Sequence, residues 1–245
     1  MSTLEELTIK EVAIRIAGDI ILSPNPGKAM RKWRDVFGIP QTELAAFIGV
    51  SASVISDYES GRRKSPGSRF VKKFVYGLIR KDLERGGRVV WGLSRIILGS
   101  DQLREAILDI REFSTPVTIG EFCRAAKAVL LVGEEAADQP LLGYTVVDSI
   151  KLVLDVPSHD YLRLYGATTQ RAAVFTKVSL GRSPLVAIKA MQAGTGGLRP
   201  ALVVLHGPEE PDRLGVEIAK REGIPLALSK ASSIEELINS LRSLG

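Results

Sequence analysis

The segment from Ser51 to Lys64 carries polar side chains whose spacing suits one kind of chemistry. If Val54, Ile55 and Tyr58 form the apolar side of a short helix, four small or polar residues face outward: Ala52, Ser53, Ser56 and Asp57. Hydroxyl and carboxylate groups can hydrogen-bond to the edges of bases, and a small methyl group can contact the methyl of thymine. We therefore expect these four side chains to contact DNA bases.

Cations surround this segment and could contact the phosphates of a duplex. Residues 28–88 hold fourteen Lys and Arg against six Asp and Glu, whereas residues 115–245 hold fourteen of each. A solvated charged face is the simpler explanation of such a run, but beside a base-contacting segment we favour phosphate binding. Backbone N–H groups at helix N-termini add further anion sites. The expected phosphate contacts are Lys28, Lys32, Gln41, Ser51, Arg62, Arg63 and Lys64.

Two short helices packed at a steep angle would position these groups. Apolar or small residues recur where such helices must touch, namely Leu44, Ala45, Ile48, Val50, Val54, Ile55 and Tyr58. Ala45 leaves room for the second helix, and Gly49 can adopt the positive φ of a sharp turn. Ser51 is expected to cap the second helix by accepting hydrogen bonds from its first N–H groups.

This pattern resembles the Xre/lambda-repressor/Cro family of helix-turn-helix domains over roughly residues 28–85. The matching residues are Gln41, Glu43, Leu44, Ala45, Gly49, Val54, Ile55, Tyr58, Glu59, Gly61 and Arg63. The resemblance implies a DNA-binding transcriptional regulator whose recognition helix, about Ser51–Ser60, enters the major groove. It also implies an ion pair between Arg34 and Glu59. Because one such domain reads only a few base pairs, we expect a homodimer on double-stranded DNA.

Length and composition favour two domains inside the cell. The 245 residues are 45% hydrophobic and 25% charged, with a formal net charge of +5, as in folded soluble proteins. The single cysteine, Cys123, excludes an internal disulfide and is most simply a small buried hydrophobe. No signal peptide or apolar run long enough to span a bilayer is visible, so we expect a cytoplasmic protein.

The order of elements predicts an α plus α/β fold: a helix-turn-helix domain over residues 1–86, a helical connector over 87–114 and an α/β domain over 115–245. Helices are expected at 7–22, 28–37, 68–85, 101–113, 120–131, 146–156, 212–222 and near the C-terminus, in addition to the pair of short helices that Gly49 separates within 41–60. Strands are expected at 173–178 and 185–190, joined as a hairpin, and at 201–205 and 224–228.

The C-terminal half carries no catalytic motif. The whole chain more loosely resembles archaeal-type predicted transcriptional regulators through the stretches GYTVVDSIKLVL, YLRLYGATTQRA and VVLHGPEEPD. A polar cluster around Gly166 could hold an anionic effector, although an ordinary solvated loop is the simpler explanation; its members are Arg163, Tyr165, Thr168, Thr169 and Arg171. We expect no cofactor and no metal site, because the chain has two histidines and one cysteine.

Two alternatives to a DNA-binding regulator stay open at this stage. The C-terminal domain could be an enzyme for a small anion, which a pocket lined by Arg163, Arg171 and His206 would favour. The helix-turn-helix could instead bind another protein, as in bridging coactivators with this fold. Binding that weakens as salt rises would argue for DNA.

Overall fold

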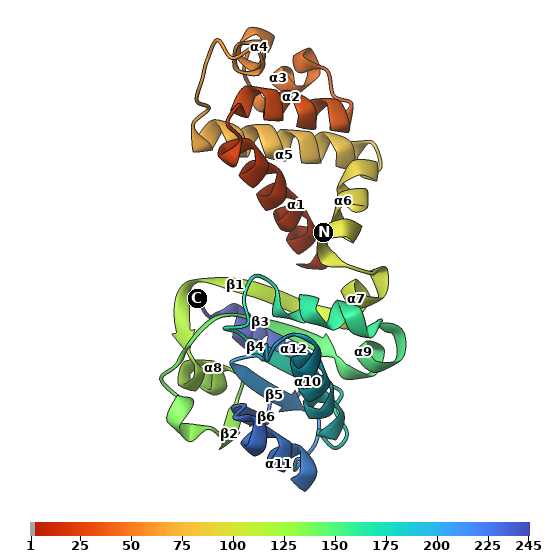
Figure 1. Ribbon diagram of the computed structural model, residues 1–245, viewed down its shortest axis with the longest axis vertical. Coiled ribbons are helices and arrows are strands. Elements are labelled where there is room, and N and C mark those ends of the chain that lie inside the picture. Colours follow the sequence, from red (N-terminus) through yellow and green to blue (C-terminus); the bar gives the residue numbers. More distant parts are fainter. Residues whose placement is uncertain (1–2) are drawn as a thin grey trace. The chain divides into compact units, whose positions relative to one another are not determined.

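The computed structural model describes residues 3–245, and the chain divides into two compact units between Leu98 and Gly99. The first, unit 1, is helical (Figure 1). Its helices in chain order are α1 (Thr3–Leu22), α2 (Pro26–Phe37), α3 (Gln41–Ile48), α4 (Ala52–Glu59), α5 (Ser68–Glu84) and α6 (Arg88–Leu98). The helical expectations for this region are met, apart from shifts at the ends.

The core of unit 1 follows from helical spacing. On α1, Val12, Ile16 and Ile20 recur every four residues and are fully buried. Phe74 and Leu78 of α5 repeat the same spacing and are also fully buried, in the same apolar cluster. The two stripes therefore form a base on which α2 and α3 pack, and α4 packs in turn against α2 and α3.

A glycine allows the start of α2 to touch the end of α4. A Cβ built on Gly27 would lie 1.8 Å from the carbonyl oxygen of Tyr58, which is far inside van der Waals contact. No larger residue fits at this position without moving the backbone. The second helix of the predicted pair is therefore fixed by contacts from outside the pair.

The second unit, unit 2 (residues 99–245), contains a six-stranded sheet with helices on both sides (Figure 1). Its strands are β1 (Ile107–Thr118), β2 (Ala128–Val132), β3 (Pro140–Asp148), β4 (Ala172–Thr176), β5 (Leu202–His206) and β6 (Leu226–Ser229). Its helices are α7 (Asp101–Ala106), α8 (Ile119–Ala125), α9 (Ser149–Asp155), α10 (Arg182–Gly194), α11 (Arg213–Glu222) and α12 (Ile234–Arg242), with short 3-10 turns at Glu134–Ala136 and Ser158–Tyr165.

The strand order is β1-β3-β4-β5-β6-β2. The four central strands β3 to β6 are parallel and follow each other in sequence, whereas β1 and β2 close the two edges in the antiparallel sense. Central strands of this kind are buried on both faces, which explains their continuous apolar sequences. All five residues of β4 are buried, as expected from the run AAVFT.

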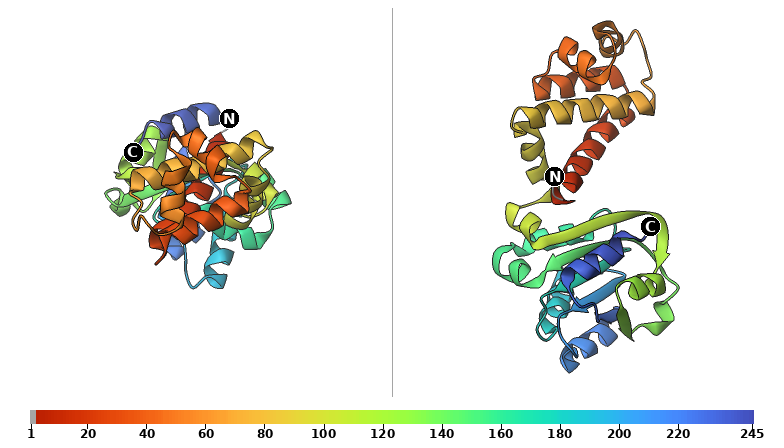
Figure 2. Two further views of the ribbon diagram at one scale, coloured as in Figure 1. Left: turned by 90° about the horizontal axis from the view of Figure 1, so that it is seen from above. Right: turned by 180° about the vertical axis from the view of Figure 1, so that it is seen from behind.

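Side chains of the central strands alternate between two apolar cores. Ala173 and Phe175 of β4 pack with α9, α10 and α11, whereas Ala172 and Val174 pack with α8 and α12. Figure 2 shows α12 and α8 on the opposite side of the sheet from α10 in the view from behind. Unit 2 is therefore a three-layer α/β domain.

Two helices expected from the sequence are shorter than predicted because strands replace part of each. The predicted helix 101–113 is helical only in α7, and the chain then enters β1. Asp109 of β1 is buried and accepts a hydrogen bond from the hydroxyl of Tyr144 at 2.7 Å. Because that partner comes from a neighbouring strand, local periodicity gave no indication of it. Residues 120–131 similarly divide between α8 and β2.

The predicted helix 146–156 begins later, since residues 146–148 complete β3 before α9 starts. The predicted hairpin is wrong, because residues 185–190 belong to α10. Gly181 precedes this helix in a left-handed conformation, Pro184 lies in its first turn, and Leu185 and Ile188 are buried one turn apart. Gly181 and Pro184 are typical of the start of a helix, but the alternating apolar residues after them favoured a strand.

The segment expected to be a helical connector, residues 87–114, is divided between the two units. Residues 88–98 form α6 and pack on the core of unit 1, while residues 99–114 begin unit 2. Cys123 is buried on α8, and burial raises the pKa of its thiol to about 11, in line with a structural role. Within residues 3–245, the helices are all too short or too polar to cross a lipid bilayer.

Candidate nucleic-acid interface

Helices α3 and α4 are joined by the sharp turn that the sequence predicts. Gly49 adopts a φ of 73°, and the N–H of Val50 donates to the carbonyl of Ala45 at 3.0 Å. Ser51 occupies the capping position of α4, but its side chain accepts no hydrogen bond from the helix. Its Oγ lies 2.7 Å from Oγ of Ser53 instead, so the expected cap is absent. Both hydroxyls remain at the exposed start of α4.

The outward face of α4 differs from the prediction at two positions. Ala52 is partly buried and packs against the core of unit 1, together with the fully buried Ile55. Val54, expected in the core, is only partly buried and is not among the side chains packed on that core. The helical period explains the exchange, because positions 52, 55 and 59 share one side and position 54 lies away from it. The exposed face is therefore centred on Ser53, Val54 and Asp57.

Asp57 is already engaged with the cations that follow α4. Its Oδ1 accepts a hydrogen bond from Nε of Arg62 at 2.7 Å, and its Oδ2 lies 3.8 Å from Nε of Arg63. The guanidinium of Arg63 also lies 5.7 Å from the ring centroid of Tyr58. These contacts hold the two arginines near the exposed face and offset part of their charge.

The ion pair expected between Arg34 and Glu59 is present. Nε and Nη2 of Arg34 donate to the two carboxylate oxygens of Glu59 at 2.7 and 2.9 Å, a bidentate geometry. Nη1 of Arg34 also donates to the carbonyl of Ile39 at 3.1 Å. The hydrogen bond that Arg34 donates to Glu59 raises the pKa of Arg34. The pair ties the end of α4 to α2.

Gln41 joins this buried network instead of facing outward. Its side-chain amide donates to Oε2 of Glu59 at 2.7 Å, which turns the nitrogen inward. Gln41 is the first residue of α3, so its backbone N–H still lies at a helix N-terminus. Any phosphate contact from this residue is therefore limited to its backbone N–H and the second N–H of its side-chain amide.

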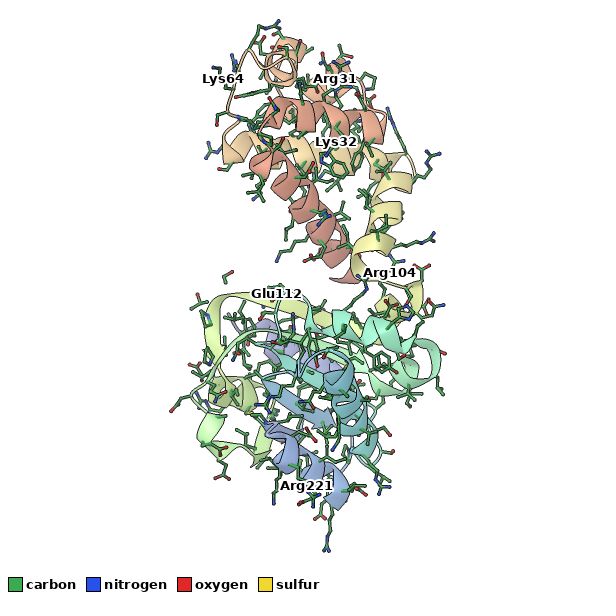
Figure 3. All side chains as sticks on the ribbon, viewed as in Figure 1. Arg31, Lys32, Lys64, Arg104, Glu112 and Arg221 are labelled. Atoms are coloured by element: carbon green, nitrogen blue, oxygen red, sulfur yellow. The ribbon has the colours of Figure 1, made fainter. Side chains whose placement is uncertain are left out.

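The lysines among the predicted phosphate contacts are all exposed, but one of them is held in an ion pair. Lys28 and Lys64 are exposed, and Lys64 projects from the loop between α4 and α5 (Figure 3). Lys32 is also exposed but is paired with Asp19 of α1, which accepts a second hydrogen bond from Nε1 of Trp33 at 2.7 Å. The hydrogen bond from Lys32 contributes most to lowering the pKa of Asp19. Lys32 thus fastens α2 to α1.

The predicted effector cluster in unit 2 does not form a pocket. Arg171 is fully buried and paired with Glu112 of β1 at 2.7 Å, and it also donates to the carbonyl oxygens of Tyr144 and Tyr165. Figure 3 labels Glu112 on that strand. A Cβ on Gly166 would lie 2.0 Å from Nη1 of Arg171, so no space for a ligand remains there. Arg171 links β1, β3 and the turn at Tyr165 through these hydrogen bonds, and its assignment as an effector contact is wrong.

The other members of the cluster point to different partners. Arg163 donates to Asp160 at 3.2 Å, and Tyr165 is buried with its hydroxyl directed to the carbonyl of Leu198 at 3.4 Å. Thr168 accepts a hydrogen bond from the N–H of Gln170 at 3.1 Å, within its own turn. Thr169 lines a cavity of about 780 Å³ at the amino ends of the central strands. The sequence placed these residues together, but their side chains do not converge.

Comparisons with known proteins identify the family. The family model described as Helix-turn-helix matches residues 30–75, which include α3 and α4. An uncharacterized HTH-type transcriptional regulator of Methanocaldococcus jannaschii is 43% identical over 97% of this chain and 96% of its own length. One of Archaeoglobus fulgidus is 44% identical over 96% of this chain and 98% of its own length.

A solved structure has a weaker likeness. It holds the CBS and DRTGG domains of the regulatory region of Clostridium perfringens pyrophosphatase with diadenosine tetraphosphate, and it covers 50% of this chain and 45% of its own at 15% identity. Its TM-score of 0.34 is too low to support any argument. The two archaeal relatives, by contrast, match both units nearly end to end. The chain belongs to the family of archaeal HTH-type transcriptional regulators.

Proposed function

We propose that this protein regulates transcription in the cytoplasm by binding double-stranded DNA, with α4 in the major groove. The observation that carries the proposal is the outward face of α4, where Ser53 is exposed and Asp57 holds the cations Arg62 and Arg63. A helix of this kind can present polar groups to base edges while neighbouring cations contact the backbone. The names of the archaeal relatives support the same function.

The short side chains on this face favour a particular mode of recognition. Ser53 and Asp57 can reach base edges only if α4 lies deep in the groove, and Val54 adds a methyl-bearing surface suited to thymine. Direct readout by such a face is modest, so we propose that DNA shape and pairing of two protein copies supply the remaining specificity. Ser56 and Ala52 contribute at the margins, because the helical period places both closer to the buried side of α4.

Selection of bound duplexes from a random pool tests the proposal. We expect a two-fold symmetric site to be enriched by the full-length protein. Replacing Ser53 with Ala and Val54 with Ser should change the enriched sequence, because both residues lie on the exposed face. The matched control changes Ser240 to Ala and the exposed Val129 to Ser in unit 2. Enrichment of one unchanged site by all three proteins would contradict the assignment of α4.

Salt dependence tests the phosphate contacts separately. Replacing Lys64 with Gln should weaken binding to every duplex and reduce the slope of log affinity against log salt by about one. Lys220→Gln in unit 2 is the charge-matched control and should leave both unchanged. If the two changes had equal effects, net charge alone would explain them. If neither change had an effect, Lys64 would not be part of the interface.

A homodimer is the second part of the proposal. Unit 1 has a groove of about 910 Å³ between α1, α2 and α6, and its lining includes the exposed apolar side chains of Ile14, Leu22 and Ile96. Apolar groups gathered in this way on a soluble protein commonly mark a contact with another chain. We propose that two copies associate through this groove, which would present two copies of α4 to the duplex.

Sedimentation equilibrium of the full-length protein tests this association. We expect a dimer for the parent and a monomer for Ile14→Glu with Ile96→Glu, because a buried carboxylate opposes association. The control Leu214→Glu places the same charge on an exposed apolar position of unit 2. A dimer that persists in the double variant would exclude this groove as the interface.

The enzyme alternative gains no support from the site geometry. Its three proposed residues do not share a cavity, since Arg171 is fully buried, Arg163 is paired with Asp160, and His206 contacts the carbonyl of Ala231 at 3.2 Å. Binding to a protein partner through unit 1 remains the competing outcome of the DNA selection. In that case no duplex is enriched, and binding to DNA is insensitive to the Lys64 variant.

A further inference from the structure

Unit 2 has a second cavity, of about 410 Å³, at the carboxyl ends of its central strands. Lys177, Ser179, Gly181 and Ser183 line one side, in and after the loop that joins β4 to α10. Residues 149–154 of α9 line another side. Open parallel sheets commonly bind ligands at this edge, and the volume is that of a small-molecule site. It shares no lining residue with the expected effector cluster around Gly166.

One buried polar atom on a residue of the cavity wall has no partner. Oγ of Ser149 is shielded from solvent behind that wall and forms no hydrogen bond within the described residues. Buried hydroxyl groups almost always have a partner, so this orphan points to a polar ligand group bound close to it, which reaches it through a small shift of the lining. Ser149 can both donate and accept, which suits an oxygen atom of a ligand.

The start of α10 supplies further unused donors. Gly181 precedes this 13-residue helix and has no side chain with which to cap it. The N–H groups of Arg182 and Ser183 donate to no acceptor in residues 3–245, and the helix dipole favours an anion at this end. Nζ of Lys177 lies 2.7 Å from Oδ2 of Asp148 and retains two further N–H groups. This end of the cavity is therefore suited to an acid group.

The loop that carries these donors is held in place. Lys177 has a φ of 55°, which is uncommon for a residue with a side chain. A Cβ on Gly207, in the loop after β5, would lie 2.4 Å from the carbonyl oxygen of Val178, and one on Gly181 would lie 2.6 Å from Leu205. Two glycines thus allow the neighbouring loops to pack closely. A strained residue kept in a tightly packed loop is typical of a binding site.

The rest of the lining is apolar and open to solvent. Ile150, Val153 and Leu154 of α9 are more than half exposed, as is Leu180 of the loop. Together with Ala187 of α10 they form an apolar wall beside the polar end. A ligand that fits both parts has an acid group attached to a short apolar body. Inorganic phosphate would satisfy only the polar part, and a hydrocarbon would satisfy only the wall.

We propose that this cavity binds a small organic anion with an apolar body, held by its acid group at the start of α10. The larger cavity at the opposite edge of the sheet fits this ligand less well, because Glu134 and Glu135 line it. The proposal does not depend on DNA binding, since binding of the anion is measured without DNA. It gives unit 2 the effector role that the cluster around Gly166 does not fill.

Calorimetric titration of the full-length protein with acetate, butanoate and hexanoate tests the proposal. We expect affinity to rise about threefold to fourfold per methylene group, because each one is buried against the apolar wall. Hexan-1-ol and inorganic phosphate should each bind more weakly than hexanoate. In NMR spectra the amide shifts caused by hexanoate should concentrate at residues 149–154 and 177–187. Hexanol that binds as tightly as hexanoate, or shifts centred on unit 1, would overturn the proposal.

Two variants separate ligand binding from folding. Ser183→Asp adds a carboxylate to the first turn of α10, which suits the helix but should weaken hexanoate binding about tenfold through like-charge repulsion. Gln102→Asp makes the same change in the first turn of α7, away from the cavity, and should leave binding unchanged. Ser149→Ala should weaken binding without lowering the melting temperature, since its hydroxyl has no partner in the protein.

The variants also distinguish the proposal from an interface between copies. If a second copy covered this wall, Ser183→Asp would change the sedimentation mass while no carboxylate bound the parent. That result would overturn the proposal, as would equal hexanoate affinities for the parent, Ser183→Asp and Ser149→Ala. Loss of DNA selection with intact hexanoate binding would contradict the proposed regulator and leave this site standing.

Discussion

Asp57 and Glu59 lie two residues apart on α4 but face opposite environments. Glu59 is turned into unit 1, where Arg34 and Gln41 satisfy its carboxylate, and its side chain is only 3% exposed. Asp57 is turned outward and holds Arg62 at 2.7 Å. The carboxylate of Glu59 therefore fixes α4 to the rest of unit 1, whereas the carboxylate of Asp57 restrains nearby cations.

Removing the buried carboxylate should unfold unit 1 more readily. We expect Glu59→Ala to lower the free energy of unfolding by about 3–5 kcal/mol, because the largely buried Arg34 then loses its bidentate partner and keeps only the exposed carboxylate of Asp35. The double variant Arg34→Leu with Glu59→Leu should recover most of that loss. Urea denaturation followed by circular dichroism measures both values.

Glu84→Ala is the matched control for this experiment. Its carboxylate pairs with Lys81 at 2.7 Å, but its side chain is 53% exposed, and exposed pairs contribute about 0–1 kcal/mol. A loss as small for Glu59→Ala as for Glu84→Ala would contradict the role given to the Arg34–Glu59 pair.

Removing the outward carboxylate should have a different effect. Asp57→Asn releases Arg62 and Arg63 and deletes a negative charge, so we expect affinity for all duplexes to rise and the salt slope to steepen by about one. Fluorescence anisotropy with a random-sequence duplex at several salt concentrations measures the change, and Asp155→Asn in unit 2 is the control. A new base preference at one position with unchanged affinity for random DNA would instead make Asp57 a reader of bases.

Among the elements, α12 is tied to the sheet by a carboxylate at its start. Glu236 pairs with Lys127, next to β2, and also accepts hydrogen bonds from the backbone N–H of Ser232 at 2.7 Å and its hydroxyl at 2.8 Å. The hydrogen bond from Lys127, followed by the Ser232 N–H, lowers the pKa of Glu236 from 4.5 to about 2. The charged form is therefore favoured by folding.

This depressed pKa gives unit 2 a defined response to acid. The contribution of Glu236 to stability is complete above its unfolded pKa of 4.5 and is lost as pH falls through the folded value of about 2. Glu236→Gln should thus lower the melting temperature above pH 5, and the difference from the parent should shrink below pH 4.5. Calorimetry between pH 2 and 7 measures this, with the exposed neighbour Glu235→Gln as control. A difference that stays constant down to pH 2 would contradict the account.

Local sequence patterns predicted the elements of unit 1 better than those of unit 2. Capping and turn residues such as Gly49 act within a few positions, so the pair of helices and the Arg34–Glu59 contact could be anticipated. β1 could not, since Asp109 depends on Tyr144 and Arg242 from distant parts of the chain. The candidate DNA face was predicted except for Ala52 and Val54, whose environments depend on how α4 is rotated against the core.

At the scale of the whole molecule, the two units have separate apolar cores. The buried residues in the core of unit 1 all lie between positions 9 and 90, and those in the two cores of unit 2 lie from 103 onward. We expect residues 1–98 to fold alone, with amide spectra that match those of unit 1 in the full chain.

A chain ending at residue 225 should keep unit 1 folded but lose unit 2, because β6 and α12 are missing. β2 would then lack its antiparallel partner, and Phe122 would lose contact with the cluster that holds Leu237 and Leu241. NMR spectra of the three chains measure this. Native dispersion from unit 2 residues in the shortened chain would contradict the expectation.

The pairing of β2 with β6 also orders events during synthesis on the ribosome. Ala128 of β2 pairs with Ser229 of β6, and the three central strands β3, β4 and β5 are synthesised between these two residues. Unit 1 is complete once Leu98 has left the exit tunnel, whereas β2 must wait with an open edge until residues near 229 emerge. A nascent protein could therefore engage DNA before its second unit is finished, and slow translation of the last third would prolong exposure of that edge to aggregation.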